Sequence, residues 1–477
     1  MRNWMRELSL HYEIIRNNYP DDKLLILFDI DGTILDMRYT IKALLKSYDK
    51  EFKTAYFTNL KLTDIDFPEE ELEQALVRMG VEFRHIGQIL DWYGKNRWSN
   101  WVLNEAHIPF PGVLDVIRWL QLHRNTYVGL NTARIERLRE ETLLSLNRLG
   151  KEYRVRFDND LLLMNRTERK TEIAAAKVDA IRSCRQKGYR VVAVIDNEPD
   201  ILDSIAQMEQ ADEILLLHAR PLFNLRRTVL PARAVNGNVY DLSELVRMQH
   251  LPRHIQLVWS NIQDTIQMDG FLASNVQWGD ITDLVNRFYY ANKFGDTSDS
   301  QLINLSMYEH MIGTMAEMQK GARLDLISEF IEVNGYLEVI TRFGFRPDQL
   351  WFRVNLDRFN GEDIRQLATQ FPGATIECQA DFLTPLLVDA DEKLDQLLVR
   401  LELCGVNRFG VDWHTRKMKQ MVEWLDDAGR NVALNNVYGY DAFLQAVLLG
   451  PQAIVSDFSF PEMNKVTEPV SEHRQLQ

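Results

Sequence analysis

The sequence predicts an α/β protein in which a doubly wound parallel sheet with an inserted helical cap is followed by a (β/α)8 TIM-type barrel. Three observations support this fold class. At 477 residues the chain is too long for one hydrophobic core, so two or three domains are expected. Strand patterns alternate with helical patterns, which is typical of parallel sheets. The second half holds eight strand patterns in roughly 210 residues, close to the usual barrel size of about 250.

The first half begins with a predicted helix over residues 1–20. The apolar run Leu24–Phe28 then predicts a strand over 24–30 that is buried on both faces, as in a parallel sheet. From 37 to 107 the pattern is helical and rich in charge, and Pro109 follows its end. We therefore expect residues 37–107 to form a helical cap that is inserted after the first strand.

Three further strands complete the predicted sheet. They lie at 127–130, 191–195 and 213–217, and helical patterns accompany them at 113–122, 134–149 and 173–187. This βα alternation places residues 1–36 and 108–245 in one core domain.

The second half repeats the βα pattern from about residue 250. Strand patterns occur at 255–259, 276–281, 322–326, 350–356, 374–378, 408–413, 431–435 and 453–457. Helical patterns separate most of them, for example at 363–370, 391–403, 416–428 and 440–449. A barrel over 250–462 is the favoured architecture, and an open sheet is the alternative. The polar segment 463–477 is expected to be a disordered tail.

Composition narrows the classes of partner and compartment. A net charge of −14 repels nucleic acid and anionic membranes, so neither is expected as a partner. The three cysteines, Cys184, Cys378 and Cys404, lie too far apart in sequence for a zinc motif or a disulfide framework. The amino-terminal segment has no apolar signal core, and no stretch approaches the ~20 apolar residues that span a bilayer. We expect a cytoplasmic protein with reduced thiols.

Polar side chains gather where the strands of the first half end. Asp29 and Asp31 follow the first strand, residues 131–134 follow the second, and Asp196 and Asp200 follow the third. In open α/β sheets, ligands bind beyond the carboxyl ends of the strands. Two carboxylates this close are costly to bury unless a cation or a phosphate–metal complex uses them. We therefore expect a functional site at this edge.

These residue types suit phosphoryl transfer. One carboxylate can act as a nucleophile that forms an aspartyl-phosphate, and a second can move the protons. A hydroxyl and an ammonium group can bind the phosphoryl oxygens, while further carboxylates hold Mg²⁺ through oxygen ligands.

Four segments resemble, in order, the four motifs of the haloacid dehalogenase superfamily: LLILFDIDGTILD, VGLNTAR, an upstream lysine and VVAVIDNEPD. The resemblance covers about residues 20–220, with 37–107 where that family inserts a helical cap. It implies that Asp29 is the nucleophile and Asp31 the general acid and base.

The same resemblance implies the remaining roles. Phosphate and substrate would be bound by Thr132, Ala133, Arg134 and Lys170, with Thr132 and Lys177 counted in the catalytic set. Mg²⁺ would be held by Asp29, Asp31 through its backbone carbonyl, Asp196 and Asp200. The motif lysine is either Lys170 or Lys177, and Lys177 is preferred because it begins the amphipathic stretch KVDAIRSCRQKGY.

Asp31 indicates the reaction within that superfamily. Its dehalogenases lack an acid two residues after the nucleophile, and its ion-pumping ATPases carry threonine there, whereas its phosphatases and phosphomutases carry this acid. We expect a phosphatase that hydrolyses a small phosphorylated metabolite.

Two neighbouring features have structural alternatives. Arg134 is expected to form an ion pair more than to clamp phosphate. The aromatic residues between 92 and 101, which include Trp92, Tyr93, Trp98 and Trp101, are expected to form the core of the cap more than a substrate cage.

The second half resembles the barrel of glycerophosphodiester phosphodiesterases, most clearly over 408–458. That family places a histidine–arginine pair after the first strand, where this chain has Trp259-Ser260-Asn261. Its Glu-x-Asp metal pair stands here as Asp280-Ile281-Thr282. We therefore expect a binding or regulatory barrel.

If the barrel has a ligand site, its mouth would be lined by residues just past the strand ends. The candidates are Ser260, Asn261, Asp280, Asp283, Asp325, Asn355, Asp357, Gln379, Asp381, Asp412, His414, Asn435, Asn436 and Asp457. Soluble barrels must also solvate these loops, which is the structural alternative.

Two other functions stay open from the sequence. One is a bifunctional protein, in which the barrel cleaves a diester and the sheet domain then hydrolyses the monoester. The other is a non-catalytic scaffold that binds a phosphorylated metabolite. The sequence predicts neither the substrate nor the oligomeric state.

Overall fold

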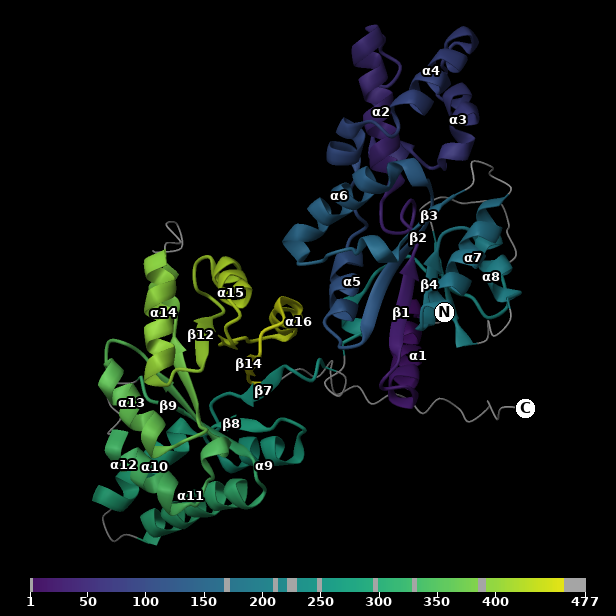
Figure 1. The fold of residues 1–477 in the computed structure, drawn as a ribbon. Coiled ribbons are helices and arrows are strands. Elements are labelled where there is room, and N and C mark those ends of the chain that lie inside the picture. The colour runs from purple at the N-terminus through teal and green to yellow at the C-terminus, as the bar shows by residue number, and fades with distance from the viewer. Residues whose placement is uncertain are drawn as a thin grey trace, which may run out of the picture. The chain divides into compact units, whose positions relative to one another are not determined.

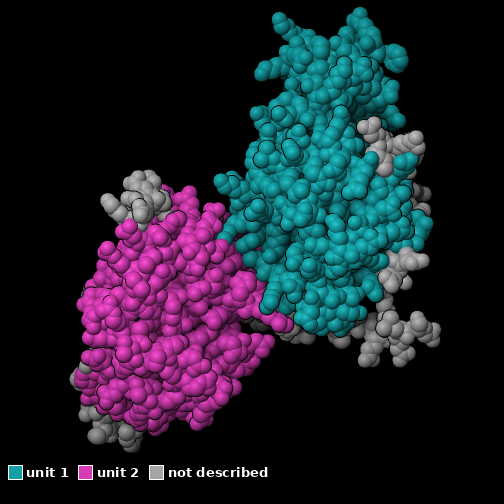
Figure 2. All heavy atoms as spheres, in the orientation of Figure 1, with its two compact units in different colours: residues 1–250 teal, residues 251–477 magenta. Residues whose placement is uncertain are grey.

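The computed structural model describes residues 3–166, 172–208, 213–220, 230–246, 251–294, 299–327, 333–384 and 392–458. The chain divides into two compact units, residues 1–250 and 251–477 (Figure 2). The first unit contains an open parallel sheet and the second a closed parallel barrel (Figure 1). This architecture confirms the predicted fold class.

The sheet of the first unit has six parallel strands in the order β3-β2-β1-β4-β5-β6. Their bounds are β1 Lys23–Phe28, β2 Thr126–Ile135, β3 Leu162–Asn165, β4 Tyr189–Asp196, β5 Leu215–Ala219 and β6 Val235–Gly237. β1 lies between β2 and β4, and all its residues after Lys23 are buried. A strand that is covered on both faces needs a continuous apolar run, which the sequence of β1 supplies.

Helices cover both faces of this sheet: α1 Trp4–Asn18, α5 Val113–Gln121, α6 Arg139–Gly150, α7 Ile173–Gln186 and α8 Pro199–Ala206. α1 begins at an N-cap, where the side chain of Asn3 accepts hydrogen bonds from two backbone amides of the first turn. α7 packs on the sheet through Val178, Ile181 and Cys184, which share a buried cluster with Leu25. This packing determines which face of α7 is directed toward the end of β1.

The inserted segment forms a helical cap with its own core. Its helices are α2 Met37–Phe52, α3 Leu72–Arg78 and α4 Phe83–Asn96, which Figure 1 shows grouped beyond the sheet. Trp92 and Tyr93 lie in the cap core and Trp101 packs against it, whereas Trp98 is only half-buried. Three of the four aromatic residues therefore have the structural role that was expected of them.

The two ends of the cap lie side by side. Leu35 and Pro109 form an antiparallel bridge. The amide of Asp36 donates to the carbonyl of Ile108 at 2.9 Å, and the amide of Phe110 donates to the carbonyl of Ile34 at 2.8 Å. We call this short antiparallel pairing, residues 34–36 with 108–110, the cap clip. It joins the cap to the sheet directly after the loop that carries Asp29 and Asp31.

The second unit is a closed barrel of eight parallel strands. Its strands are β7 Gln256–Trp259, β8 Trp278–Asp280, β9 Gly321–Asp325, β10 Leu350–Val354, β11 Thr375–Gln379, β12 Arg408–Asp412, β13 Val432–Asn435 and β14 Ala453–Ser456. Its helices are α9 Thr265–Ala273, α10 Thr282–Phe294, α11 Asp299–Glu317, α12 Val333–Arg342, α13 Gly361–Gln370, α14 Glu392–Cys404, α15 Met418–Asp427 and α16 Tyr440–Leu449. Each strand overlaps one predicted from the sequence, and pairing of β14 with β7 closes the barrel, so the open-sheet alternative is wrong.

The structure corrects several details of the first half. β3 and β6 were not predicted, because each is short and lies at an edge of the sheet. β2 continues to Ile135, so residues 131–134 belong to the strand instead of following it, and the helix expected from 134 begins at Arg139. The tail 463–477 lies outside the described residues. No helix in the described part of the chain combines the length and apolarity that a bilayer span requires.

Candidate active site

Asp29 directly follows β1, and its side chain is buried beside Lys177 of α7. Lys177 Nζ donates to Asp29 Oδ1 at 2.8 Å and to Oδ2 of Asp196, the last residue of β4, at 2.7 Å. Asp29, Lys177 and Asp196 are 6%, 3% and 1% exposed. The structure therefore brings together three of the residues predicted for the site, from β1, α7 and β4.

Burial raises the pKa of Asp29 to about 7; the Lys177 ammonium opposes this shift, and the charges of Asp196 and Asp31 add to it. Burial alone would lower the pKa of Lys177, but Asp196 and Asp29 outweigh it and hold that pKa above its ordinary value. The cluster thus contains one cation for two buried carboxylates, which leaves excess negative charge beside Asp29.

Asp31 is paired with Arg134 of β2. Arg134 Nε donates to Asp31 Oδ2 at 2.8 Å, and Nη2 donates to Oδ1 at 2.7 Å, which is a bidentate ion pair. Burial would raise the pKa of Asp31, but the charge and hydrogen bonds of Arg134 outweigh it and the pKa is lowered. Arg134 therefore has the ion-pair contact that the sequence favoured for it.

Arg134 also connects this site to its surroundings. Its Nη1 donates to Thr142 Oγ1 in α6 at 3.2 Å, and its guanidinium carbon lies 4.8 Å from the ring centre of Trp98 in the cap. Arg97 lies 4.5 Å from the same ring and forms an ion pair with Glu69 at 2.6 Å. Trp98, which is half-buried, is thus a cap residue whose ring contacts Arg134, the ion-pair partner of Asp31.

The other residues of β2 have distinct positions. Thr132 is buried, and its Oγ1 accepts a hydrogen bond from the amide of Arg134 at 3.2 Å. Asn131 Nδ2 donates to the backbone carbonyl of Lys177 at 3.1 Å and so ties α7 to this strand. Ala133 is exposed. Lys170, the other candidate for the motif lysine, lies outside the described residues.

Asp200 stands apart from the other predicted acids. It is exposed in the first turn of α8. In the part of the chain that the structure describes, no hydrogen bond or ion pair joins its side chain to Asp29, Asp31 or Asp196. No group of three acidic, histidine or cysteine side chains converges to hold a metal ion among the described residues. Among the described residues, the three carboxylates predicted for the ion, those of Asp29, Asp196 and Asp200, are therefore not grouped around one point.

Oxygen atoms nevertheless converge at one point of the site. Asp29 Oδ2 and the backbone carbonyl of Asp31 both lie 3.2 Å from the same terminal atom of the Asn197 side chain, which donates to both when the amide is oriented with its nitrogen toward them. A carboxylate and a carbonyl that face one point are donors that suit Mg²⁺. The residues thus fit the implied ion, although Asn197 was not among the predicted ligands. Its only sequence signal is its place in the DNEPD segment.

His107 is a further buried group near the site that the sequence did not single out. Its Nδ1 lies 3.4 Å from Ser145 Oγ, and its Nε2 has no hydrogen-bond partner among the described residues. Burial, reinforced by the charge of Arg134, lowers its pKa to about 4. His107 is therefore neutral near pH 7.

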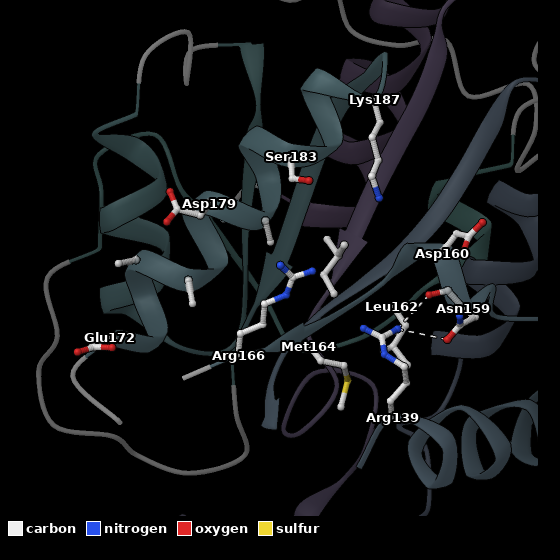
Figure 3. Close-up of a pocket in the computed structure, with 14 residues that line it drawn as sticks. Arg139, Asn159, Asp160, Leu162, Met164, Arg166, Glu172, Asp179, Ser183 and Lys187 are labelled. Atoms are coloured by element: carbon white, nitrogen blue, oxygen red, sulfur yellow. Dashed lines mark hydrogen bonds between the residues drawn. The ribbon is translucent and has the colours of Figure 1, made fainter. Parts of the chain in front are cut away.

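A pocket of about 680 Å³ lies between β3 and α7, away from these acids (Figure 3). Figure 3 shows Arg139 hydrogen-bonded to Asn159 in its wall, with Nη1 3.1 Å from the Asn159 carbonyl. None of the residues predicted for catalysis or metal binding is among those that line it. The pocket and the carboxylate site are thus separate features.

The polar residues inside the barrel pair with one another. Arg323 Nη1 donates to Asp280 Oδ2 at 2.6 Å, and Arg353 Nη1 donates to Asp325 Oδ2 at 2.7 Å. Glu377 is fully buried, and both arginines lie 3.4 Å from its carboxylate. Trp351 Nε1 and Asn435 Nδ2 also donate to this carboxylate, at 2.9 and 2.6 Å. Arg323, Arg353 and Glu377 were not among the predicted site residues, although all three lie within predicted strands, because the prediction considered polar residues just past the strand ends.

Other mouth candidates are also tied to their own neighbours. Asp412 accepts hydrogen bonds from the amide of His414 and from Asn436. Asp381 accepts hydrogen bonds from the side chains of Gln379 and Thr415. These contacts stabilise the loops that follow the strands.

No protein-family model and no curated protein matches the sequence. Among solved structures, a HAD-superfamily hydrolase, subfamily IA, variant 1, from Geobacter sulfurreducens is similar at 10% identity and a TM-score of 0.31, over 46% of this chain and 94% of that chain. A candidate glycerophosphoryl diester phosphodiesterase from Silicibacter pomeroyi is similar at 16% identity and a TM-score of 0.25, over 32% of this chain and 52% of that chain. A 2,3-dimethylmalate lyase of the PEP mutase/isocitrate lyase superfamily is similar at 14% identity and a TM-score of 0.29, over 43% and 76%. At these values the similarities assign no activity.

Proposed function

We propose that the first unit is a Mg²⁺-dependent phosphatase that hydrolyses a small phosphomonoester through an aspartyl-phosphate on Asp29. The observation that carries this proposal is the arrangement of Asp29. One of its carboxylate oxygens is held by Lys177, while the other faces the side where Asp31 and Asn197 meet. A buried carboxylate that is oriented by a lysine is suited to attack phosphorus.

In the first step, the Asp29 carboxylate forms a bond to phosphorus as the bond from phosphorus to the leaving oxygen breaks. Asp31, in its protonated form, donates a proton to that oxygen. In the second step, Asp31 takes a proton from water, and this water attacks phosphorus, which breaks its bond to Asp29 and releases phosphate.

In this scheme, Arg134 determines when Asp31 can donate a proton. Because Arg134 lowers the pKa of Asp31, proton donation requires the ion pair to loosen. A phosphoryl dianion is a strong competing partner for a guanidinium, so bound substrate would draw Arg134 away from Asp31. Arg134 would then bind phosphate, as the resemblance implies, after giving up its resting contact.

The other side chains prepare the nucleophile. Lys177 opposes the effect of burial on Asp29 and so keeps a fraction of it ionised near pH 7. Mg²⁺ would be held by Asp29 and the carbonyl of Asp31, next to Asp196, and when bound it would offset the negative charge of the phosphoryl group. We propose that the barrel binds a ligand or regulates the phosphatase.

The test is release of phosphate from p-nitrophenyl phosphate by the full chain, with MgCl₂ and with EDTA. We expect turnover only with Mg²⁺, and a loss of at least about 1000-fold in Asp29→Asn, because that variant lacks the nucleophile. Asp203→Asn, an exposed acid of α8, is the matched control and should keep wild-type turnover.

Folded protein with no turnover across a broad panel of phosphate esters would contradict this function. If such esters raised the melting temperature without being hydrolysed, the scaffold hypothesis would take its place. Release of a monoester from glycerophosphodiesters would instead favour the bifunctional hypothesis.

A further inference from the structure

Asn197 lies where a third ligand of the cation site would be required. Its terminal amide atom is 3.2 Å from both Asp29 Oδ2 and the carbonyl oxygen of Asp31. Without a cation, the amide nitrogen donates to these two oxygens and so partly compensates their charge. Rotation about the last side-chain bond exchanges this nitrogen for the amide oxygen, which is a ligand for hard cations.

The backbone of Asn197 is held by the neighbouring strands. His218 of β5 lies with Nε2 3.1 Å from the carbonyl oxygen of Asn197 and with Nδ1 2.6 Å from Asn236 Oδ1 of β6. The amide of Glu198 donates to Asp196 Oδ1 at 2.9 Å. Contacts on both sides therefore fix the loop that presents Asn197 to Asp29.

Gly32 leaves the space that this side chain occupies. It has a φ of +84°, and a Cβ at this position would lie 2.7 Å from the other terminal atom of the Asn197 amide, which is the oxygen when the nitrogen faces Asp29. Asn197 can therefore reach Asp29 and the Asp31 carbonyl only because residue 32 has no side chain.

Of the acids predicted for the ion besides Asp29, one has other partners and the other is exposed. Asp196 accepts from Lys177 and from the amide of Glu198, and Asp200 is exposed in α8. The donors that converge are one carboxylate, one backbone carbonyl and one amide.

We propose that Asn197, in place of Asp200, completes the cation site with Asp29 and the carbonyl of Asp31. This inference rests on the proposed Mg²⁺ dependence of the first unit. Because Asn197 is neutral, the site holds one negative charge less than an aspartate at the same position would give. Affinity of oxygen sites for divalent cations rises with the number of charged ligands, so the site binds Mg²⁺ weakly.

The decisive variant is Asn197→Asp in the full chain, tested with MgCl₂ alone and no substrate. We expect at least about a tenfold tighter dissociation constant by calorimetric titration, because a carboxylate replaces an amide. Without Mg²⁺ the same variant should melt at a lower temperature than the wild type, since the new carboxylate lies beside Asp29. The stabilisation by Mg²⁺ should therefore be larger than in the wild type.

Two further variants complete the test. Asn197→Ala should lose Mg²⁺ binding, whereas Asp200→Asn should leave the dissociation constant within twofold of the wild type. The inference would be overturned if Asn197→Asp bound Mg²⁺ no more tightly, or if Asp200→Asn weakened binding as much as Asn197→Ala. Because no substrate is present, a failure of turnover would count against the phosphatase and leave this result standing.

Discussion

The two units of this protein place acids at the carboxyl ends of parallel strands but surround them differently. In the first unit, one oxygen of Asp29 accepts a hydrogen bond from Lys177, and the other faces the Asn197 amide. In the barrel, Asp280 has Oδ2 on Arg323 at 2.6 Å, while Oδ1 accepts from the amide and the hydroxyl of Thr282. Burial raises the pKa of both Asp29 and Asp280. Asp29 is buried and Asp280 is half-buried, and the two acids have different partners.

An acid at a strand end therefore has no fixed role, because its neighbouring groups determine which interactions its carboxylate can make. In the barrel, Asp280 and Asp325 each accept a hydrogen bond from their own arginine, and both arginines also lie 3.4 Å from Glu377. In the first unit, Lys177 is shared by Asp29 and Asp196, and the second oxygen of Asp29 faces the neutral amide of Asn197. Variants that remove these partners are therefore expected to act on stability in the barrel and on chemistry in the first unit.

The largest expected effect on stability comes from Glu377→Gln in the barrel. It leaves Arg323 and Arg353 without the buried carboxylate between them, which should lower the free energy of unfolding of the barrel by about 3 kcal/mol. Hydrogen exchange with mass spectrometry on the full chain would locate the loss. Glu362→Gln removes an exposed i,i+3 ion pair and should cost under about 0.5 kcal/mol. Equal losses of stability in the two variants would contradict a structural role for the buried ion pairs of the barrel. A loss of phosphate release in Glu377→Gln would contradict the separation between stability in the barrel and chemistry in the first unit.

A smaller effect is expected from His107→Gln, and it depends on pH. Folding lowers the pKa of His107 from 6.5 to about 4, so the unfolded chain binds the proton more tightly. The wild type should therefore lose stability as the pH falls through 6.5 towards 4, by about 2 kcal/mol from this group. The variant should lack that part of the loss. Chemical denaturation of the first unit at pH 7.5 and 4.5 measures it, and parallel curves for both proteins would show that His107 has no such role.

The smallest expected effect distinguishes Gly32 from Gly188. Both have a left-handed backbone, with φ of +84° and +86°, so an alanine strains each by a similar amount. Only at Gly32 would the Cβ also press on Asn197, whereas nothing lies within 4 Å at Gly188. Gly32→Ala should therefore cost about 1 kcal/mol more than Gly188→Ala in thermal unfolding. It should also weaken Mg²⁺ binding, which Gly188→Ala should leave unchanged.

Much of the fold could be predicted because it depends on local patterns. Apolar runs such as Val191–Ile195 locate buried strands, and helices between them allow only parallel pairing. The edge strands β3 and β6 have no such run. β6 contains a polar residue and a glycine, and its place comes from pairing with β5.

The sequence could predict only those site residues whose proximity follows from their place at the ends of strands. Asp29 and Asp196 end neighbouring strands, so their proximity follows from the topology. Of Lys170 and Lys177, the sequence favoured Lys177, and the structure shows Lys177 donating hydrogen bonds to both Asp29 and Asp196. The role of Asn197 depends on which side chain a tight turn directs inward and on the space left by Gly32, and neither is visible in residue spacing.

The cap clip has a consequence for how such a protein can diversify. Its two segments leave and re-enter the sheet side by side, through backbone hydrogen bonds at 2.9 and 2.8 Å that do not depend on side-chain identity. An insertion of any length whose ends lie one strand apart can therefore be exchanged there without moving Asp29. The cap and the loop that carries Asp29 are thus separate stretches of the chain, and the contact of Trp98 with Arg134 is a point at which an exchanged cap would alter the surroundings of Asp31.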